Sequence, residues 1–246
     1  FITGAAHPDC AFFIVVGQTD PEARRARRHS TIIVPADQPG VRVSRELSYL
    51  GGRDSVAPIG EVFFEEVRVP AANLLGQEGD GFVSGQVRLG PARVHHCMRA
   101  IGAAEKALQL LCERAVSRVA FGKPLARLGG NIDIVAQARM DIEQARLLTL
   151  KTAWMMDNVD AKEARVWISM IKTVVPNVSI RIVDQAIQIF GALGISQDTP
   201  LAGMYMAQRT LRLADGPDEV HRMVVGRNEL RKYANQKDVN ATFRDG

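Results

Sequence analysis

Residues 94–115 read VHHCMRAIGAAEKALQLLCERA, and their apolar side chains recur at intervals of three and four residues. This spacing places the apolar residues on one face of an α-helix and predicts an amphipathic helix. The residues on this face are Val94, Cys97, Ile101, Ala104, Leu108, Leu111 and Ala115. A helix with one apolar face packs against other elements, so the stretch indicates the first helix of a helical domain.

Further helical patterns follow, separated by short connections. They are expected at about residues 132–157, from 160 to 191, at about 201–213, and from 217 onward. Asp160 and Glu163 form an N-cap pair at the start of the second of these helices, and Pro176 is expected to kink that helix or weaken one turn. Long antiparallel helices with short connections predict a bundle.

Residues 1 to about 72 have a different pattern, with short apolar runs between turn residues. Strands are expected at residues 11–16, 31–34 and 41–43, with a fourth, bulged strand formed by 61–64 and 67–70. Such runs are typical of hairpins and sandwiches. The sequence therefore predicts an α+β protein, with a β-sandwich-like domain in residues 1–75 and an antiparallel helical bundle in residues 80–240.

The bulk composition fits a soluble globular protein that binds small molecules. Of 246 residues, 46% are hydrophobic and 24% charged, and the net charge of +4 suits an anionic small molecule without requiring nucleic acid. By inspection, no apolar run approaches the roughly 20 residues that span a bilayer, so no membrane span is expected. The three cysteines lack metal-type spacing and indicate reduced thiols in the cytoplasm.

Several classes of chemistry have no motif in this chain. The sequence contains no G-x-G-x-x-G after a strand, no G-x-x-x-x-G-K-[ST] and no G-x-S-x-G, so it does not predict a Rossmann, P-loop or α/β-hydrolase site. His95 and His96 are the only adjacent histidines. Neighbouring helical side chains point about 100° apart, so the pair does not converge on one metal, and no metal site is predicted.

The densest cluster of carboxylates is Leu213-Ala214-Asp215-Gly216-Pro217-Asp218-Glu219. One interpretation is a helix start, in which Pro217 is the first helical residue and Asp215 or Gly216 is the cap. The other is that the bent, glycine-containing backbone aims the Asp215 carboxylate into a cleft as a general base. The pattern alone does not decide between the two.

Several segments, in one order along the chain, resemble motifs of the acyl-CoA dehydrogenase family. Phe1-Ile2-Thr3-Gly4 is similar to the family's W-[IF]-[ST]-[GN] strand against the flavin. The other matching segments are Phe63–Pro70 with Asn73–Gly76 and Gly79–Phe82, Arg93 with Gly102, Arg118–Leu125, and Gln188–Gly194. Residues 213–221, LADGPDEVH, resemble a subgroup that includes dehydrogenase domains fused to kinase-like domains.

The resemblance implies an amino-terminal helical domain, a middle β domain and a carboxyl-terminal four-helix bundle. The two halves of this chain match the last two parts, and the first part is expected to be missing. It also implies FAD-dependent α,β-dehydrogenation of an acyl-CoA in fatty acid β-oxidation. A carboxylate removes the α-proton while hydride passes to flavin N5. Asp215 takes the base position, which is Glu in much of the family and one methylene longer.

The resemblance assigns further site residues. Phe1, Ile2 and Thr3 would face the flavin ring. Residues that would reach FAD, for the most part across a subunit interface, are Arg118, Phe121, Gln188, Ile189, Gly191 and Ala192, with Pro217 and Glu219 near the adenine end. Gly90, Arg93 and Gly216 would contact the acyl-CoA, and the Asp215 N–H would point at its thioester carbonyl.

The implied assembly is a homodimer or homotetramer that passes electrons to an electron-transfer flavoprotein. Two alternatives stay open at this point. One is an acyl-CoA oxidase-type flavoenzyme, which would pass electrons to oxygen. The other is a non-catalytic helical interaction module that binds no flavin.

Overall fold

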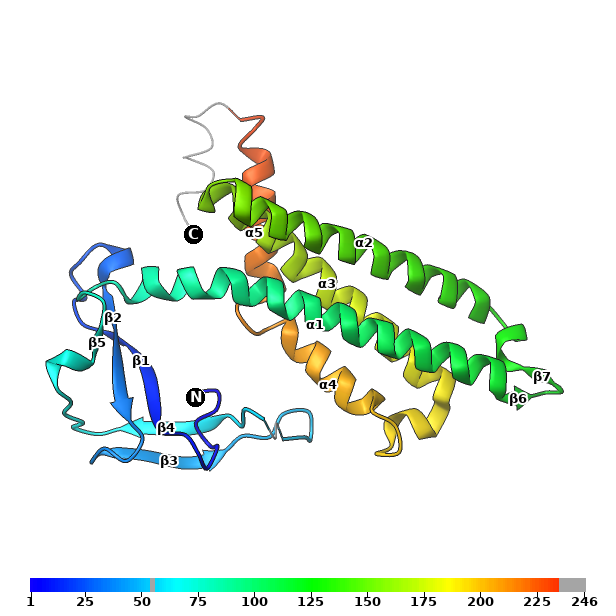
Figure 1. Cartoon of the computed structure of the whole chain (residues 1–246), viewed down its shortest axis with the longest axis horizontal. Coiled ribbons are helices and arrows are strands. Elements are labelled where there is room, and N and C mark those ends of the chain that lie inside the picture. Colours follow the sequence, from blue (N-terminus) through cyan, green and yellow to red (C-terminus); the bar gives the residue numbers. More distant parts are fainter. Residues whose placement is uncertain (54–55, 235–246) are drawn as a thin grey trace. The chain divides into compact units, whose positions relative to one another are not determined.

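The computed structural model describes residues 1–53 and 56–234. By its contacts the chain divides into two compact units, Phe1–Leu89 and a second that begins at Gly90, and each is described by itself (Figure 1). The first unit contains the longer strands, and the second contains most of the helical structure.

The first unit has two small antiparallel sheets. One has the order β1-β2-β5 and the other pairs β3 with β4. The strands are β1 (Phe12–Gln18), β2 (His29–Pro35), β3 (Val41–Glu46), β4 (Gly60–Phe64) and β5 (Leu74–Leu75). The two sheets meet where the ring of Phe13, which is 2% exposed, packs edge-on against Phe64 at 5.8 Å between ring centres. The alternation of Phe13 with its exposed neighbours follows from the period of a strand.

The fourth strand is shorter than predicted. The observed strand, β4, ends at Phe64, and the backbone turns away at Glu66, whose φ is 51°. Residues 67–70 are therefore not part of the strand. The bulge that was predicted in this strand lies instead on its partner β3, where the register shifts between Val43 and Arg45. β5 was not predicted, because two residues are too few to show a period. The sandwich-like description remains a prediction.

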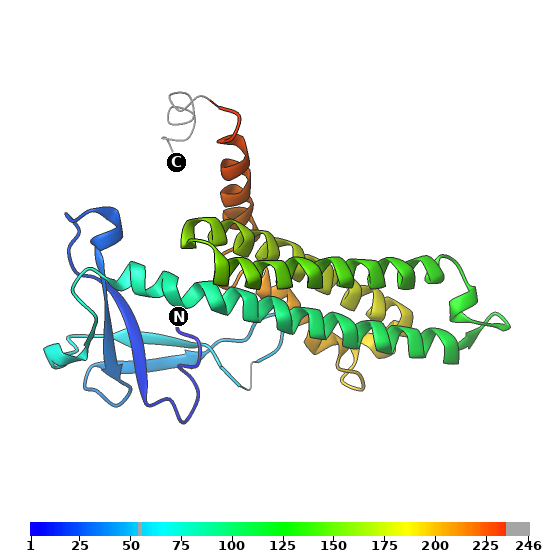
Figure 2. The ribbon, with the colours of Figure 1, turned by 45° about the horizontal axis from the view of Figure 1, so that its top comes forward.

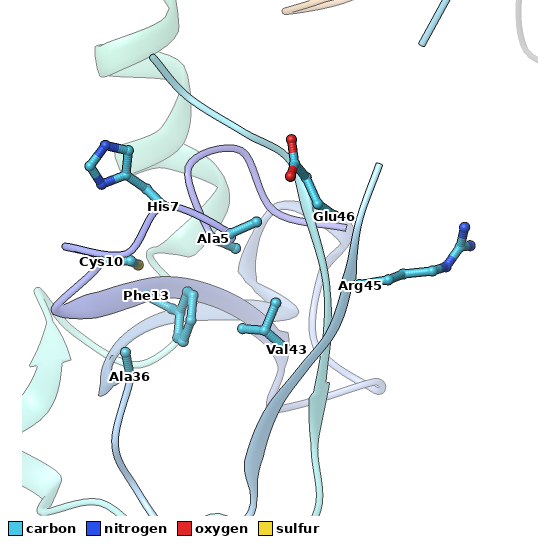
Figure 3. A pocket seen from close by; sticks show the side chains of 9 residues that line it. Ala5, His7, Cys10, Phe13, Ala36, Val43, Arg45 and Glu46 are labelled. Carbon is cyan, nitrogen blue, oxygen red and sulfur yellow. The ribbon is translucent and has the colours of Figure 1, made fainter. Parts of the chain in front are cut away.

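A cavity of about 440 Å³ opens in the first unit. Figure 3 shows its lining, which combines small and apolar side chains such as Ala5 and Phe13 with His7, Arg45 and Glu46. Arg45 donates to Glu61 at 2.8 Å, so its charge is already compensated. The His7 Nδ1 accepts the Asp9 N–H at 3.1 Å, which leaves this nitrogen engaged.

The second unit is built on long helices, as predicted. They are α1 (Gly81–Ser117, which begins in the first unit), α2 (Asn131–Asn158), α3 (Ala161–Phe190), α4 (Leu201–Leu211) and α5 (Asp218–Leu230). Figures 1 and 2 show α2 and α3 running side by side, and α3 also contacts α4 and α5. A short hairpin, β6 (Val119–Ala120) and β7 (Lys123–Pro124), joins α1 to the segment before α2.

Local signals account for the ends of α3. The Asp160 carboxylate caps its start, accepting the N–H groups of Lys162 and Glu163 at 2.9 and 2.8 Å, which confirms this N-cap. The helix ends at Gly191, with a φ of 66°. It continues through Pro176 as one helix, with that proline buried in the bundle. α4 ends two residues earlier than predicted, at Leu211.

The apolar face of α1 is the core of the bundle. All seven residues predicted on it, from Val94 to Ala115, are buried. Six of them, all but Ala115, belong to one core cluster with Ile142 of α2, Ile182 of α3 and Leu201 of α4, each 0% exposed. At the edges, Arg139 of α2 pairs with Glu105 of α1 at 2.7 Å. The spacing that predicts the first helix therefore also identifies the face that it buries.

α3 differs from the expectation about apolar runs. Ala161–Ile195 contains a window of mean hydropathy 1.4, which is long and apolar enough to cross a membrane by length and composition alone. The core helix of a soluble protein meets the same criteria. α3 packs against α2, α4 and α5 and buries a lysine side chain, and a single window of this kind is weak evidence for a membrane span.

Replacing Ile182 by Ala removes a side chain that is 0% exposed. The free energy of unfolding should fall by about 2–5 kcal/mol, the usual effect of a cavity in a packed core. Urea-induced unfolding followed by far-UV circular dichroism measures this change. The matched control is Ile132→Ala, at a residue that is 67% exposed, where a change within about 0.5 kcal/mol is expected. Equal losses in the two variants would contradict this core assignment.

Candidate active site

The turn between α4 and α5 adopts a left-handed backbone at two successive residues. Asp215 has a φ of 56° and Gly216 a φ of 110°. Aspartate tolerates this region better than most residues. At Gly216 a Cβ would lie 2.9 Å from Nε2 of His221, so only glycine fits there. The turn thus fixes the direction of the Asp215 side chain through its backbone.

The carbonyl groups of this turn are held by side chains from three helices. The Asp215 carbonyl accepts Arg93 Nε–H from α1 at 2.9 Å and faces His221 Nε2 from α5 at 3.4 Å. The Lys172 ammonium on α3 donates to the carbonyls of Leu211 and Gly216. The turn is therefore fastened on both sides of Asp215.

Lys172 is 0% exposed, and burial lowers the pKa of its amine. Its partners are carbonyl oxygens at the carboxyl end of α4 and in the turn, where the helix dipole is negative. His221 is also buried, and burial followed by the charges of Arg93 and Lys172 lowers its pKa. His221 is thus neutral at neutral pH and can donate one N–H to the Asp215 carbonyl.

The Asp215 carboxylate contacts His96 on α1. Its Oδ2 lies 3.1 Å from His96 Nε2, and the two side chains are 23% and 22% exposed. The hydrogen bond from His96 lowers the pKa of Asp215, with help from the charges of His96, Arg93 and Lys172, and these effects outweigh burial. The carboxylate is therefore ionised at neutral pH, partly open to solvent, and able to accept a proton.

The backbone N–H of Asp215 has no hydrogen-bond acceptor among the residues that the structure describes. The neighbouring N–H groups of Leu213 and Ala214 both donate to the Thr210 carbonyl. Asp215 is half-buried, so this N–H is open to solvent and is a candidate contact for a bound carbonyl oxygen. Its direction toward a substrate carbonyl stays a prediction.

The capping interpretation of Asp215 was wrong. The N-cap of α5 is Pro217, without a side-chain cap, and the carboxylate of Asp215 turns to His96. Asp218 takes the structural role, because it is 1% exposed and accepts from Asn177 at 2.9 Å and Arg212 at 2.8 Å. Burial raises the pKa of Asp218, but the hydrogen bonds from Asn177 and Arg212 outweigh this effect, and the pKa is lowered overall.

The other predicted residues fall into separate groups. Arg93 and Gly216 lie at the Asp215 turn, and Gly90 is one helical turn before Arg93, facing Ile168 of α3. Pro217 and the exposed Glu219 begin α5. Residues Phe1, Ile2 and Thr3 belong to the first unit, where Ile2 forms an isolated bridge with Gly60.

The remaining group lies at the far end of the bundle from Asp215. Phe121 is 94% exposed at the tip of the β6–β7 hairpin, and Arg118 precedes that hairpin. The exposed Gln188, Gly191 and Ala192, with the half-buried Ile189, form the end of α3. Arg114 lies over the Phe190 ring at 5.4 Å and so connects the end of α1, next to the hairpin, with the end of α3. Along α1, His96 and Ser117 are roughly 30 Å apart.

Three residues at the turn were missed from the sequence. These are His96, for which only a structural or substrate-contact role was considered, Lys172 and His221. Lys172 carried a usable signal, because it interrupts the apolar face formed by Ile168, Ile171 and Val175. Across residues 1–53 and 56–234, no group of three or more metal-binding side chains is found.

Comparison with known proteins assigns the chain. The family model described as acyl-CoA dehydrogenase, C-terminal domain, matches residues 79–230. The chain belongs to the acyl-CoA dehydrogenase family. A Mycobacterium tuberculosis member, named probable acyl-CoA dehydrogenase FadE2, is 50% identical over 228 residues, which are 93% of this chain and 56% of that protein.

Two further members of the acyl-CoA dehydrogenase family extend the comparison. Acyl-CoA dehydrogenase family member 11 of Gallus gallus is 50% identical over 93% of this chain and 30% of its own length. The solved structure of a Mycobacterium abscessus protein assigned to these dehydrogenases has a TM-score of 0.92 and 51% identity, over 94% of this chain and 57% of that one. The chain thus spans about half or less of these relatives.

In this acyl-CoA dehydrogenase family member, Lys172→Met should lower the free energy of unfolding by about 1–3 kcal/mol, because two carbonyls lose their donor. Chemical denaturation measures the change. Lys162→Met, at an exposed residue of the same helix, should change it by no more than about 0.5 kcal/mol. A more stable Lys172→Met protein would show that the buried charge costs more than its hydrogen bonds contribute.

The lowered pKa of Asp215 predicts a pH-dependent contribution to stability. Because folding favours the ionised form, this contribution is fully present above the unfolded pKa of about 3.9. It is lost as the pH falls through the lower folded-state pKa. The difference in unfolding free energy between the wild type and Asp215→Asn should therefore shrink as the pH falls below about 4. Denaturant titrations at a series of acidic pH values test this, and a difference that stays constant would refute it.

Proposed function

We propose that the protein catalyses FAD-dependent α,β-dehydrogenation of an acyl-CoA, with Asp215 as the base that removes the α-proton. The proposal rests on two polar groups of Asp215. The residue combines an ionised, partly exposed carboxylate with a backbone N–H that lacks an acceptor among the described residues. Both groups lie in a turn that Arg93 and Lys172 fasten to the bundle.

This pair of groups suits the chemistry of a thioester. The α-proton is weakly acidic until the carbonyl oxygen is polarised, and a backbone N–H pointing at that oxygen stabilises the charge that develops on it. The carboxylate then takes the proton, for which heavy atoms must come within about 2.6–3.2 Å. Because Asp215 carries only one methylene, its reach depends on the left-handed backbone that projects it.

The far end of the bundle fits the proposed cofactor. Phe121 offers an aromatic surface that is 94% exposed, with the exposed Arg118 cation beside it for a pyrophosphate. The exposed turn from Gln188 to Ala192 would add FAD contacts at this end. Pro217 and Glu219, which lie beside Asp215 at the other end, would contact FAD there, and Phe1, Ile2 and Thr3 would face its ring. FAD bound there would supply the acceptor for the β-hydride of the substrate.

His96 and Ser117 lie roughly 30 Å apart along α1. This separation supports FAD sites that are shared between subunits of a homodimer or homotetramer. Arg118 and Phe121 are too far from Asp215 to face the same part of one cofactor, so they would serve the site of a neighbouring subunit. The proposed electron acceptor is an electron-transfer flavoprotein. Oxygen consumption in place of transfer to that protein would identify an oxidase.

Asp215→Asn should retain FAD but bleach it about 10²–10⁴-fold more slowly, because the amide cannot accept the α-proton. Anaerobic stopped-flow absorbance of the full-length protein, with butyryl-, octanoyl- and palmitoyl-CoA, measures the rate. The control is Asp198→Asn, an exposed aspartate between α3 and α4, which should bleach as the wild type does. Unchanged bleaching in Asp215→Asn would refute the base assignment, and a wild-type protein without bound flavin would refute the dehydrogenase proposal.

A further inference from the structure

The contact between His96 and the Asp215 carboxylate continues to a third residue. The Arg99 guanidinium, one turn further along α1, lies with its terminal nitrogen 3.2 Å from His96 Nδ1. A guanidinium has donors but no acceptor. His96 Nδ1 must therefore accept this hydrogen bond through its lone pair, which puts the ring proton of neutral His96 on Nε2. That proton points at Asp215 Oδ2, 3.1 Å away.

We propose that His96, with its tautomer set by Arg99, is a positioning residue that holds Oδ2 of the Asp215 base, so that Oδ1 is the oxygen that takes the α-proton. This inference rests on the proposed function of Asp215. His96 does not touch the reacting atoms in this scheme. It acts through the orientation of the carboxylate, and the proton that leaves the substrate α-carbon ends on Asp215 Oδ1.

The other polar groups around Asp215 do not supply this orientation. Arg93 and His221 face its backbone carbonyl, and Lys172 donates to the carbonyls of Leu211 and Gly216. The charges of Arg93 and Lys172 add to the field that keeps the carboxylate ionised. Among the described residues, His96 is the side chain that bonds the carboxylate itself.

An aspartate base is one methylene shorter than glutamate, so it depends more on a hydrogen-bond partner that orients its carboxylate. The backbone at Asp215 is fixed by its φ of 56° and by the carbonyl contacts on either side. The remaining freedom is rotation about the Cα–Cβ bond and about the last bond, Cβ–Cγ, and the second rotation is broad for aspartate. A hydrogen bond to one oxygen limits this rotation and presents the other oxygen, so it offsets part of the lost reach.

The first test observes the tautomer and does not require catalysis. Full-length FAD-loaded protein with ¹⁵N-labelled histidine gives long-range ¹H–¹⁵N correlations that distinguish Nε2–H from Nδ1–H, and His96→Phe assigns the signal. We expect the Nε2–H form in the wild type and its loss or mixing in Arg99→Leu. An Nδ1–H form in the wild type would overturn the proposal.

The second test separates positioning from packing. In His96→Phe, anaerobic flavin bleaching by octanoyl-CoA should slow by about 10- to 100-fold, the factor for losing a hydrogen bond to a charged group. The substrate concentration for half-maximal rate should change little. The acid limb of the rate should move to higher pH, because the pKa of Asp215 loses its largest lowering cause. His96→Gln, which keeps an N–H donor, should recover most of the rate.

The matched control is His95→Gln, since His95 is exposed and its ring centre lies 6.2 Å from that of His96. This variant should bleach at the wild-type rate. If His96→Gln is as slow as His96→Phe, or if His96→Phe keeps the wild-type acid limb, the positioning role is wrong. If the wild type is bleached by none of the three acyl-CoA probes, the proposed function fails, and the tautomer measurement still decides how His96 is held.

Discussion

The buried ammonium of Lys172 is the contact on which the arrangement around Asp215 depends. A charged amine without a carboxylate partner is expensive to bury, and here carbonyl oxygens at the end of α4 and in the following turn replace water. The same oxygens stand at the negative end of the α4 dipole. One side chain from the core of α3 thus joins the Asp215 turn to the bundle, and the turn cannot move without exposing or stranding that charge.

Two carboxylates three residues apart have different roles because their surroundings differ. Asp218 is enclosed, and its Oδ2 accepts from Asn177 and Arg212, which holds the first turn of α5, while its buried Oδ1 has no hydrogen-bond partner among the described residues. Asp215 is partly open, and its only side-chain bond among the described residues leaves one oxygen available. The physical distinction is exposure: the free oxygen of Asp218 is sealed inside the fold, whereas that of Asp215 belongs to a side chain that is partly open to solvent.

The sequence predicts the helices well because their period is long and repeated. The seven apolar residues of α1 and the Asp160 cap are local features, and both were confirmed. The end of β4 was missed because the turn at Glu66 requires a left-handed residue that is not glycine. The partner of Asp215 could not be predicted from the pattern, since His96 lies 119 residues earlier and meets it only through the packing of α1. Lys172 could have been found as a charge on an apolar face, but its acceptors could not.

α1 carries His96 near one end of the bundle and the β6–β7 hairpin at the other. Each residue of a helix adds about 1.5 Å and rotates the chain by about 100°. Inserting or deleting one residue between 97 and 117 would therefore swing Phe121 and Arg118 around the helix axis relative to His96, besides moving the apolar face out of the core. The length of this segment is as constrained as the identity of its residues, and variation in chain length should fall in the connections outside it.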